Sequence, residues 1–115
     1  MSIKLLKNRN YAPESLGKTC VLGLGKTGKV VADYLLDNLG NRVNSVHIYA
    51  GNKNEFSLRS ADKLISRGAT VSFDDDELKE SYDLCVASPG IPQHSNIYVS
   101  AEEKCEELIS EVELA

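Results

Sequence analysis

The apolar positions of the chain alternate between short runs and longer helical stripes. The short runs suit buried strands, and the longer segments repeat apolar residues every three or four positions, as one face of a helix does. Strands are predicted at residues 19–24, 46–50, 69–73, 82–88 and 108–112, and helices at residues 29–38, 57–67 and 95–107. Residues 74–77 (DDDE) are predicted to open a brief helical turn.

The order of these segments predicts the fold class. Strands that alternate with helices pair in parallel through right-handed crossovers, so we expect an α/β, Rossmann-like doubly wound sheet of about five strands with flanking helices. Residues 1–16 are polar and irregular and are interpreted as an N-terminal arm, and residues 17–115 as one domain. A chain of 115 residues is long enough to bury a core without a metal or disulfide.

Charge and hydropathy narrow the class of partner. The net charge of −4 argues against broad binding to nucleic acid or to an anionic membrane. It leaves a small anionic ligand open, because backbone N–H groups can form a phosphate site. No apolar run approaches the roughly 20 residues of a membrane span, and residues 1–10 lack a signal-peptide core. The sequence therefore predicts no nucleic-acid partner and no membrane partner.

The cysteines and histidines offer no recognisable motif along the chain. Cys20, Cys85 and Cys105 are odd in number and widely spaced, which predicts neither a disulfide framework nor a zinc site. Free thiols in apolar strands behave as small hydrophobes and favour a reduced, cytoplasmic setting. His47 lies in a predicted strand and is interpreted as a packing residue, and His94 as a neighbour of a loop. We predict no metal site and no catalytic residue.

A glycine loop follows the first predicted strand. Residues 23–28 (GLGKTG) match G-x-G-x-x-G between a strand and a helix, which is the context the motif requires. Its glycines permit a tight turn, a close approach of phosphate and close packing of the helix. The helix N-terminus adds unpaired N–H groups, and Lys26 and Thr27 add a cation and a hydroxyl. The alternative is a strand–helix turn without a ligand.

A dinucleotide is the first ligand to consider for such a loop. NAD binding calls for an acidic residue about 20 positions on, which holds the ribose 2′-OH. Residues 46–52 (VHIYAGN) contain no such acid, so NAD is disfavoured. NADP would favour an arginine there, and Lys53 is the cation close by.

A second loop follows the fourth predicted strand. Residues 86–91 (VASPGI) include a serine hydroxyl and a glycine that can approach a phosphate. In a doubly wound sheet, ligands lie at the carboxyl ends of the strands, where the strand order reverses. The first and fourth strands meet there, so residues 88–90 are predicted to face the glycine loop. The alternative is an ordinary turn that ends a strand.

The two loops, in this order and at this separation, resemble the Mur ligases, and within that family the branch that adds D-glutamate. The matching segments are residues 21–28 (VLGLGKTG), 83–92 (DLCVASPGIP) and 109–115 (ISEVELA), so the resemblance runs from about Leu16 to Ala115. It implies that the chain binds the UDP part of UDP-N-acetylmuramoyl-L-alanine for peptidoglycan biosynthesis. The residues that it implies in nucleotide binding are Gly25, Lys26, Thr27, Gly28, Tyr49, Ala50, Gly51, Ser88, Pro89 and Gly90.

The resemblance also implies parts that this sequence lacks. Family members use ATP and Mg²⁺ to form an acyl phosphate, in a central domain with a glycine-rich, lysine-containing phosphate loop, and hold the amino acid in a C-terminal domain. Nothing in the chain matches G-x-x-x-x-G-K-[ST], so we expect a piece of a ligase that binds nucleotide without catalysis or a cofactor of its own. The family often has an acid after the second strand to hold uracil, and Tyr49 or backbone groups are the candidates here. An NAD(P)-binding domain and a non-catalytic interaction module remain the alternatives.

Overall fold

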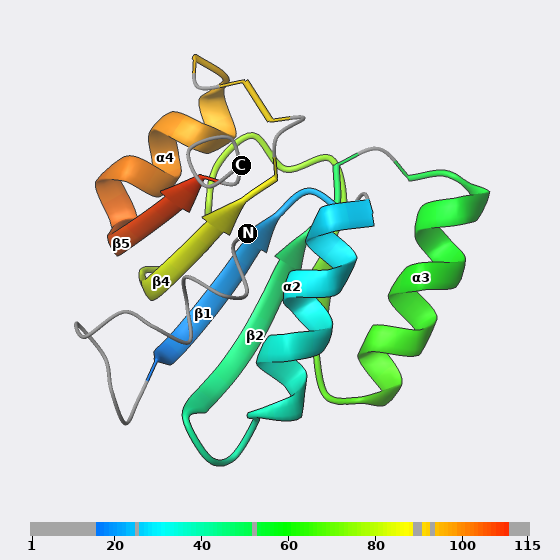
Figure 1. The fold of residues 1–115 in the computed structure, drawn as a ribbon. Coiled ribbons are helices and arrows are strands. Elements are labelled where there is room, and N and C mark those ends of the chain that lie inside the picture. The colour runs from blue at the N-terminus through cyan, green and yellow to red at the C-terminus, as the bar shows by residue number, and fades with distance from the viewer. Residues whose placement is uncertain (1–15, 25, 52, 89–90, 93, 111–115) are drawn as a thin grey trace.

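The computed structural model describes residues 16–24, 26–51, 53–88, 91–92 and 94–110 of the 115-residue chain. The described elements alternate between strand and helix, except that a loop joins the third strand directly to the fourth (Figure 1). In chain order they are β1 (Gly17–Leu22), α2 (Lys26–Asp37), β2 (Val43–Tyr49), α3 (Glu55–Ser66), β3 (Thr70–Ser72), β4 (Tyr82–Ala87), α4 (Asn96–Lys104) and β5 (Cys105–Ser110). The predicted order of strands and helices is confirmed.

The five strands form one parallel sheet in the order β3-β2-β1-β4-β5. The chain runs outward from β1 through β2 to β3 and then crosses to the other side of β1 for β4 and β5. The strand order therefore reverses between β1 and β4, as the sequence predicted. This is the Rossmann-like doubly wound arrangement, in which the reversal creates a crevice beyond the carboxyl ends of the central strands.

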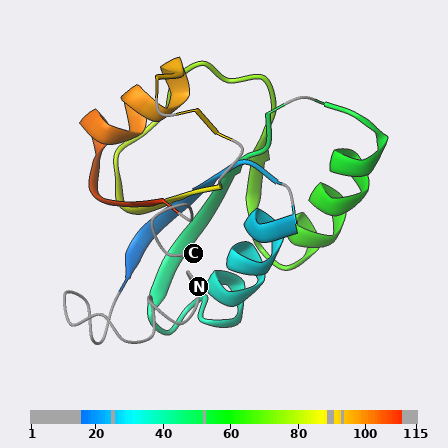
Figure 2. The same cartoon turned by 45° about the horizontal axis from the view of Figure 1, so that its top comes forward.

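Successive side chains of each strand face opposite sides of the sheet and build two cores. On β1, Val21 packs in one core, and Cys20 and Leu22 pack in the other. Helices α2 and α3 lie side by side over the first face, and α4 covers part of the second (Figures 1 and 2). Among the described residues, no helix is both long enough and apolar enough to cross a membrane.

Helix α3 begins at Glu55, two residues before the predicted start at residue 57. The Asn54 side chain accepts a hydrogen bond from the backbone N–H of Ser57 at 2.9 Å, and the Ser57 hydroxyl accepts one from the backbone N–H of Asn54 at 2.9 Å. This reciprocal pair is a capping box, which satisfies amide groups that the first turn leaves unpaired. Ser57 therefore lies inside the helix that it was predicted to start.

The predicted helical turn at residues 74–77 is wrong. These residues form bends, and Asp74 has a φ of 57°, in the left-handed region. The Asp74 N–H donates to the Gly51 carbonyl at 2.7 Å, so this end of the segment is bonded across to the β2–α3 loop rather than to its own next turn. The link between β3 and β4 is thus a loop, residues 73–81, whose Leu78 is buried against the second face of the sheet.

The predicted boundary between the last helix and the last strand is also wrong. Helix α4 ends at Lys104, and β5 already begins at Cys105, so residues 105–107 belong to a strand and not to the predicted helix. Cys105 pairs with Tyr82, the first residue of β4. Pairing along β4 satisfies backbone groups on both strands and outweighs the local helix preference of Glu106 and Glu107.

Candidate functional site

Three loops leave the sheet together at the carboxyl ends of the central strands. The Gly23 N–H, just after β1, donates to the Tyr49 carbonyl at the end of β2 at 2.8 Å. The Ser88 N–H, just after β4, donates to the Leu22 carbonyl at the end of β1 at 3.0 Å. These bonds extend the ladder past the strands and place the loops after β1, β2 and β4 at one edge. The prediction that the loop at Ser88 lies beside the glycine loop is confirmed for Gly23 and Ser88.

The glycine loop packs so closely that two of its positions depend on glycine. Gly23 has a φ of 92°, a backbone conformation that residues other than glycine rarely adopt. A Cβ atom on Gly28 would lie closer than 3.0 Å to the Gly23 carbonyl oxygen and to the Ser88 hydroxyl, nearer than real Cβ atoms approach. The first turn of α2 is therefore pressed against the end of β1 and against Ser88 at the same point.

Ser88 carries a buried hydroxyl that has no hydrogen-bond partner among the described residues. Its residue is 9% exposed, and its Oγ is one of the described buried side-chain atoms without a hydrogen bond. Leaving a buried hydroxyl unpaired costs about 1 to 3 kcal/mol. The group lies beside Gly23 and Gly28, where the strand order reverses.

The unpaired hydroxyl leads to a prediction about folding stability. Ser88→Ala is expected to raise the free energy of unfolding by about 1 kcal/mol, because it removes the cost of the unpaired hydroxyl without losing a hydrogen bond. Ser100→Ala is the matched comparison, since Ser100 is 7% exposed and its Oγ accepts from the Leu78 N–H at 2.9 Å. That variant is expected to lose about 1 to 2 kcal/mol by leaving the amide unpaired. Urea unfolding of both variants measures the difference, and equal losses would contradict the prediction.

The three residues predicted to bind nucleotide at the end of β2 differ in exposure. The Tyr49 side chain is buried in the second core, where its hydroxyl accepts from the Lys79 N–H at 3.0 Å. Its aromatic ring therefore faces away from the edge, and its carbonyl is the group that reaches the glycine loop. Ala50 is half-buried, and Gly51 is exposed with open space around its α-carbon. An acid is absent at this position, as the sequence indicated.

Several residues of the predicted site fall outside the detailed description. Gly25, Pro89 and Gly90 lie outside the described residues. Lys26 and Thr27 form the start of α2, so their backbone belongs to the helix N-terminus beside Ser88. An N-terminal turn offers unpaired N–H groups and a partial positive charge to an anion.

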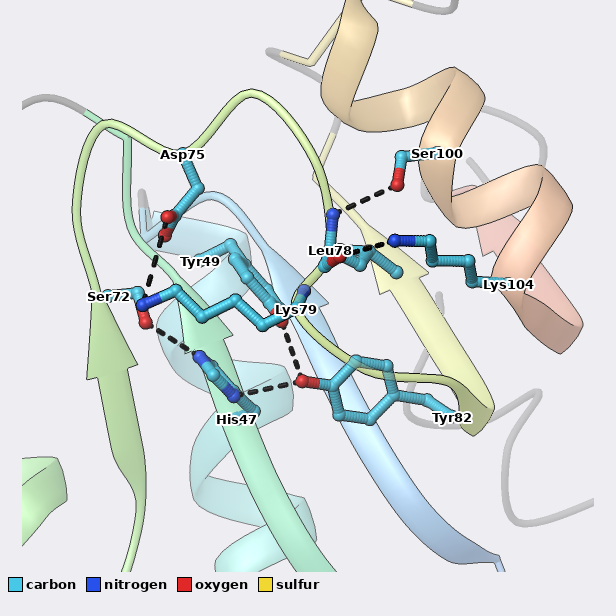
Figure 3. Close-up of polar contacts among 9 residues, drawn as sticks. All are labelled: His47, Tyr49, Ser72, Asp75, Leu78, Lys79, Tyr82, Ser100 and Lys104. Carbon is cyan, nitrogen blue, oxygen red and sulfur yellow. Dashed lines mark hydrogen bonds and ion pairs between the residues drawn. The ribbon is translucent and has the colours of Figure 1, made fainter.

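The sequence did not predict a buried polar chain on the second face of the sheet (Figure 3). The Tyr82 hydroxyl bonds to the Tyr49 hydroxyl at 2.6 Å and to His47 Nδ1 at 2.9 Å. His47 Nε2 bonds to the Ser72 hydroxyl at 2.7 Å, and the His47 ring stacks on Tyr49 with centroids 4.2 Å apart. His47 is thus the packing residue that the sequence predicted, with both ring nitrogens bonded.

Burial sets the protonation state of the side chains in this hydrogen-bonded group. Desolvation lowers the pKa of His47 and raises the pKa values of Tyr49 and Tyr82, so all three side chains are neutral near pH 7. The same region holds the β3–β4 loop, because Lys79 donates its N–H to Tyr49 and Lys104 Nζ donates to the Leu78 carbonyl at 2.7 Å. These contacts hold the β3–β4 loop against the end of β2 on the second face of the sheet.

The structure also brings together the three cysteines that the sequence left apart. The Sγ atoms of Cys20, Cys85 and Cys105 all lie within 4.8 Å of one another. They come from three adjacent strands, β1, β4 and β5. Wide spacing along the chain gave no signal of this cluster, because parallel strands join residues that are far apart in sequence.

Comparison with known proteins identifies two curated relatives that have the same name. No protein-family model matches the chain. Two curated relatives share the name UDP-N-acetylmuramoylalanine--D-glutamate ligase. The relative from Streptococcus gordonii is 36% identical over 110 residues, which cover 93% of this chain and 23% of that protein. The relative from Protochlamydia amoebophila is 26% identical over 101 residues, which cover 84% of this chain and 21% of that protein.

The two matches cover most of this chain but only a small part of each relative. The chain spans about a fifth of the length of the two curated relatives. The match to the Streptococcus gordonii protein covers 93% of this chain and omits only a few residues at its ends. It therefore includes both the glycine loop and the loop at Ser88. The comparisons agree with the resemblance drawn from those two motifs and support a role related to that of these ligases.

Proposed function

We propose that the chain is the UDP-binding unit of a Mur ligase that adds D-glutamate to UDP-N-acetylmuramoyl-L-alanine. The observation that carries the proposal is the meeting of the glycine loop with Ser88 where the strand order reverses. At that point, glycine is required for close packing, and a buried hydroxyl has no partner in the part of the chain that the structure describes. A phosphate at the start of α2 would accept from backbone N–H groups and from this hydroxyl. The names of both curated relatives agree with such a ligand.

Each motif residue has a role in this proposal. The N–H groups of residues 25–28 hold the diphosphate, and Lys26 and Thr27 supply a cation and a hydroxyl beside it. Ser88 binds the phosphate through its hydroxyl, and Pro89 and Gly90 are assigned to the same site by the motif. The Tyr49 ring is bonded inside the core, so uracil is read by backbone groups of Ala50 and Gly51.

The proposed chain binds nucleotide without catalysing a reaction. Forming an acyl phosphate on the substrate requires ATP and Mg²⁺, and the phosphate-loop motif that would hold them does not occur in this sequence. These functions belong to the ligase's own central and C-terminal domains, which are the proposed protein partners of this unit.

Amide NMR of the 115-residue chain tests the proposal by titration with UDP and, separately, with NAD. UDP is expected to shift the amides of residues 25–28, Ser88 and Gly90, and NAD is expected to leave them unchanged. Ser88→Ala is expected to weaken UDP binding about tenfold, the effect of about 1.4 kcal/mol, while the protein stays folded. His94→Gln is the control variant and is expected to bind as the parent chain does.

Other outcomes would replace the proposal. A selective response to NAD would favour an NAD(P)-binding domain. No response to either nucleotide at millimolar concentration, in a chain whose spectrum shows that it is folded, would favour an interaction module that has the fold without the ligand.

A further inference from the structure

The three cysteines form a compact group of sulfur atoms on the second face of the sheet. Cys20 on β1 pairs directly with Cys85 on β4, and Cys105 is the first residue of β5. Their Sγ atoms lie within 4.8 Å of one another. Cys20 and Cys85 are fully buried, while Cys105 is partly exposed.

We propose that Cys20, Cys85 and Cys105 form a three-sulfur binding site for a soft metal ion, and that Cu(I) is the ion they suit. Metal–sulfur bonds are about 2.3 Å long, so three sulfurs around one ion in a plane lie about 4 Å apart. The observed separations need to close by less than about 1 Å, which small rotations of the cysteine side chains supply. The site is separate from the proposed nucleotide site, and the inference does not depend on it.

The set of ligands favours Cu(I) over zinc. In the described part of the chain, the group consists of three thiols, and no histidine or carboxylate joins it. Structural zinc is almost always bound by four protein ligands, and a catalytic zinc completes three with water. Two of the three sulfurs are enclosed in a core beside Leu22 and Ala87, which favours an ion that accepts three ligands. Thiolates are soft ligands, and Cu(I) is among the ions that they select.

A cleft beside Cys105 provides a route to the cluster. It has a volume of about 290 Å³, and Cys105 is one of its lining residues. The charged side chains that line it are Lys18, Asp83, Glu103, Lys104 and Glu106. Three carboxylates against two ammonium groups favour entry of a cation. The cleft opens near the starts of β4 and β5, whereas the glycine loop follows the end of β1.

Binding exchanges protons for the metal. Each S–H bond that breaks is replaced by one S–Cu bond, three protons pass to the solvent, and copper remains Cu(I). Affinity is therefore expected to rise with pH.

Anaerobic titration of the reduced chain with Cu(I), in competition with a chromophoric Cu(I) chelator, tests the inference. One Cu(I) per chain is expected, and X-ray absorption is expected to show three sulfur neighbours. Cys105→Ala is the principal variant, because this residue lies at the edge of the core. It is expected to weaken binding more than about a hundredfold, beyond the roughly 10- to 100-fold cost of losing an outer-shell partner.

A double variant separates a built site from thiols in general. Cys105→Ala combined with Ile65→Cys keeps three thiols but moves one to α3, on the other face of the sheet, where Ile65 is 49% exposed. It is expected to bind as weakly as Cys105→Ala alone. Binding as tight as that of the parent chain would overturn the inference. So would displacement of Cu(I) by equimolar Zn²⁺, or the absence of binding by a chain that circular dichroism shows to be folded.

Discussion

Replacing Gly28 with alanine is expected to destabilise the domain by about 3 kcal/mol, at the upper end of the cost of overpacking. The added Cβ would lie closer than 3.0 Å to the Gly23 carbonyl oxygen, which belongs to the backbone and cannot rotate away. Alanine is the better helix former by about 1 kcal/mol, so helix propensity alone predicts the opposite sign. Thermal and urea unfolding measure the change, and a loss of this size corresponds to a fall in Tm on the order of 10 °C.

Gly40→Ala is the control for the loss of a glycine. Gly40 has a φ of 84° and nothing within 4 Å of an added Cβ, so the variant is strained without a clash. It is expected to lose about 1 to 2 kcal/mol through its left-handed backbone. Gly28→Ala is also expected to abolish the UDP response proposed above, whereas Gly40→Ala keeps it. A Gly28→Ala protein as stable as the parent chain would contradict the packing described for the two loops.

Lowering the pH from 7 to 5 is expected to destabilise the domain through His47. Burial lowers the pKa of this residue below 6.5, so the unfolded chain binds a proton before the folded chain does. Stability is therefore complete above pH 6.5 and is lost as the pH falls from 6.5 toward the lower pKa of the folded state. One proton limits the slope to about 1.4 kcal/mol per pH unit. Urea unfolding across this range measures the slope.

The hydrogen bonds of His47 give the physical reason. A neutral ring with its proton on Nε2 donates to Ser72 and accepts at Nδ1 from the Tyr82 hydroxyl. A proton on Nδ1 would reverse the direction of the hydrogen bond to Tyr82. Tyr82 would then donate to Tyr49, and the Tyr49 hydroxyl proton would have no acceptor in this group.

Two glutamine variants test this assignment. The chain has two histidines, and His94 is exposed. His47→Gln is expected to lose most of the pH dependence between 5 and 7, and His94→Gln to keep it. An unchanged slope in His47→Gln would rule out His47 as its source.

Much of the fold follows from local patterns. Apolar runs and helical stripes predicted the order of strands and helices, because the period of hydrophobic positions depends on local geometry alone. The glycine loop was found by its residue types at fixed spacing. The rule that parallel strands reverse order at a switch point then predicted that Ser88 would lie against that loop.

The errors occurred where distant segments decide the local structure. The start of β5 at Cys105 follows from pairing with Tyr82, and the bends at residues 74–77 follow the left-handed Asp74 and its bond to Gly51. The helix preference of Glu106 and Glu107, and the acidic residues 74–77 that suit a first helical turn, are outweighed by backbone bonds to other segments. Helix α3 began early for a local reason, the capping box at Asn54, which the sequence contains but the prediction did not use.

The sequence by itself determined which side chains alternate toward each face of the sheet and which loops follow the strands. Only the tertiary structure decided which of those side chains meet. The chain through His47 and Tyr82 and the cluster of Cys20, Cys85 and Cys105 both join residues of different strands. The physical reason is that periodicity along one strand sets the face of a side chain, whereas its neighbours on that face depend on strand order and register.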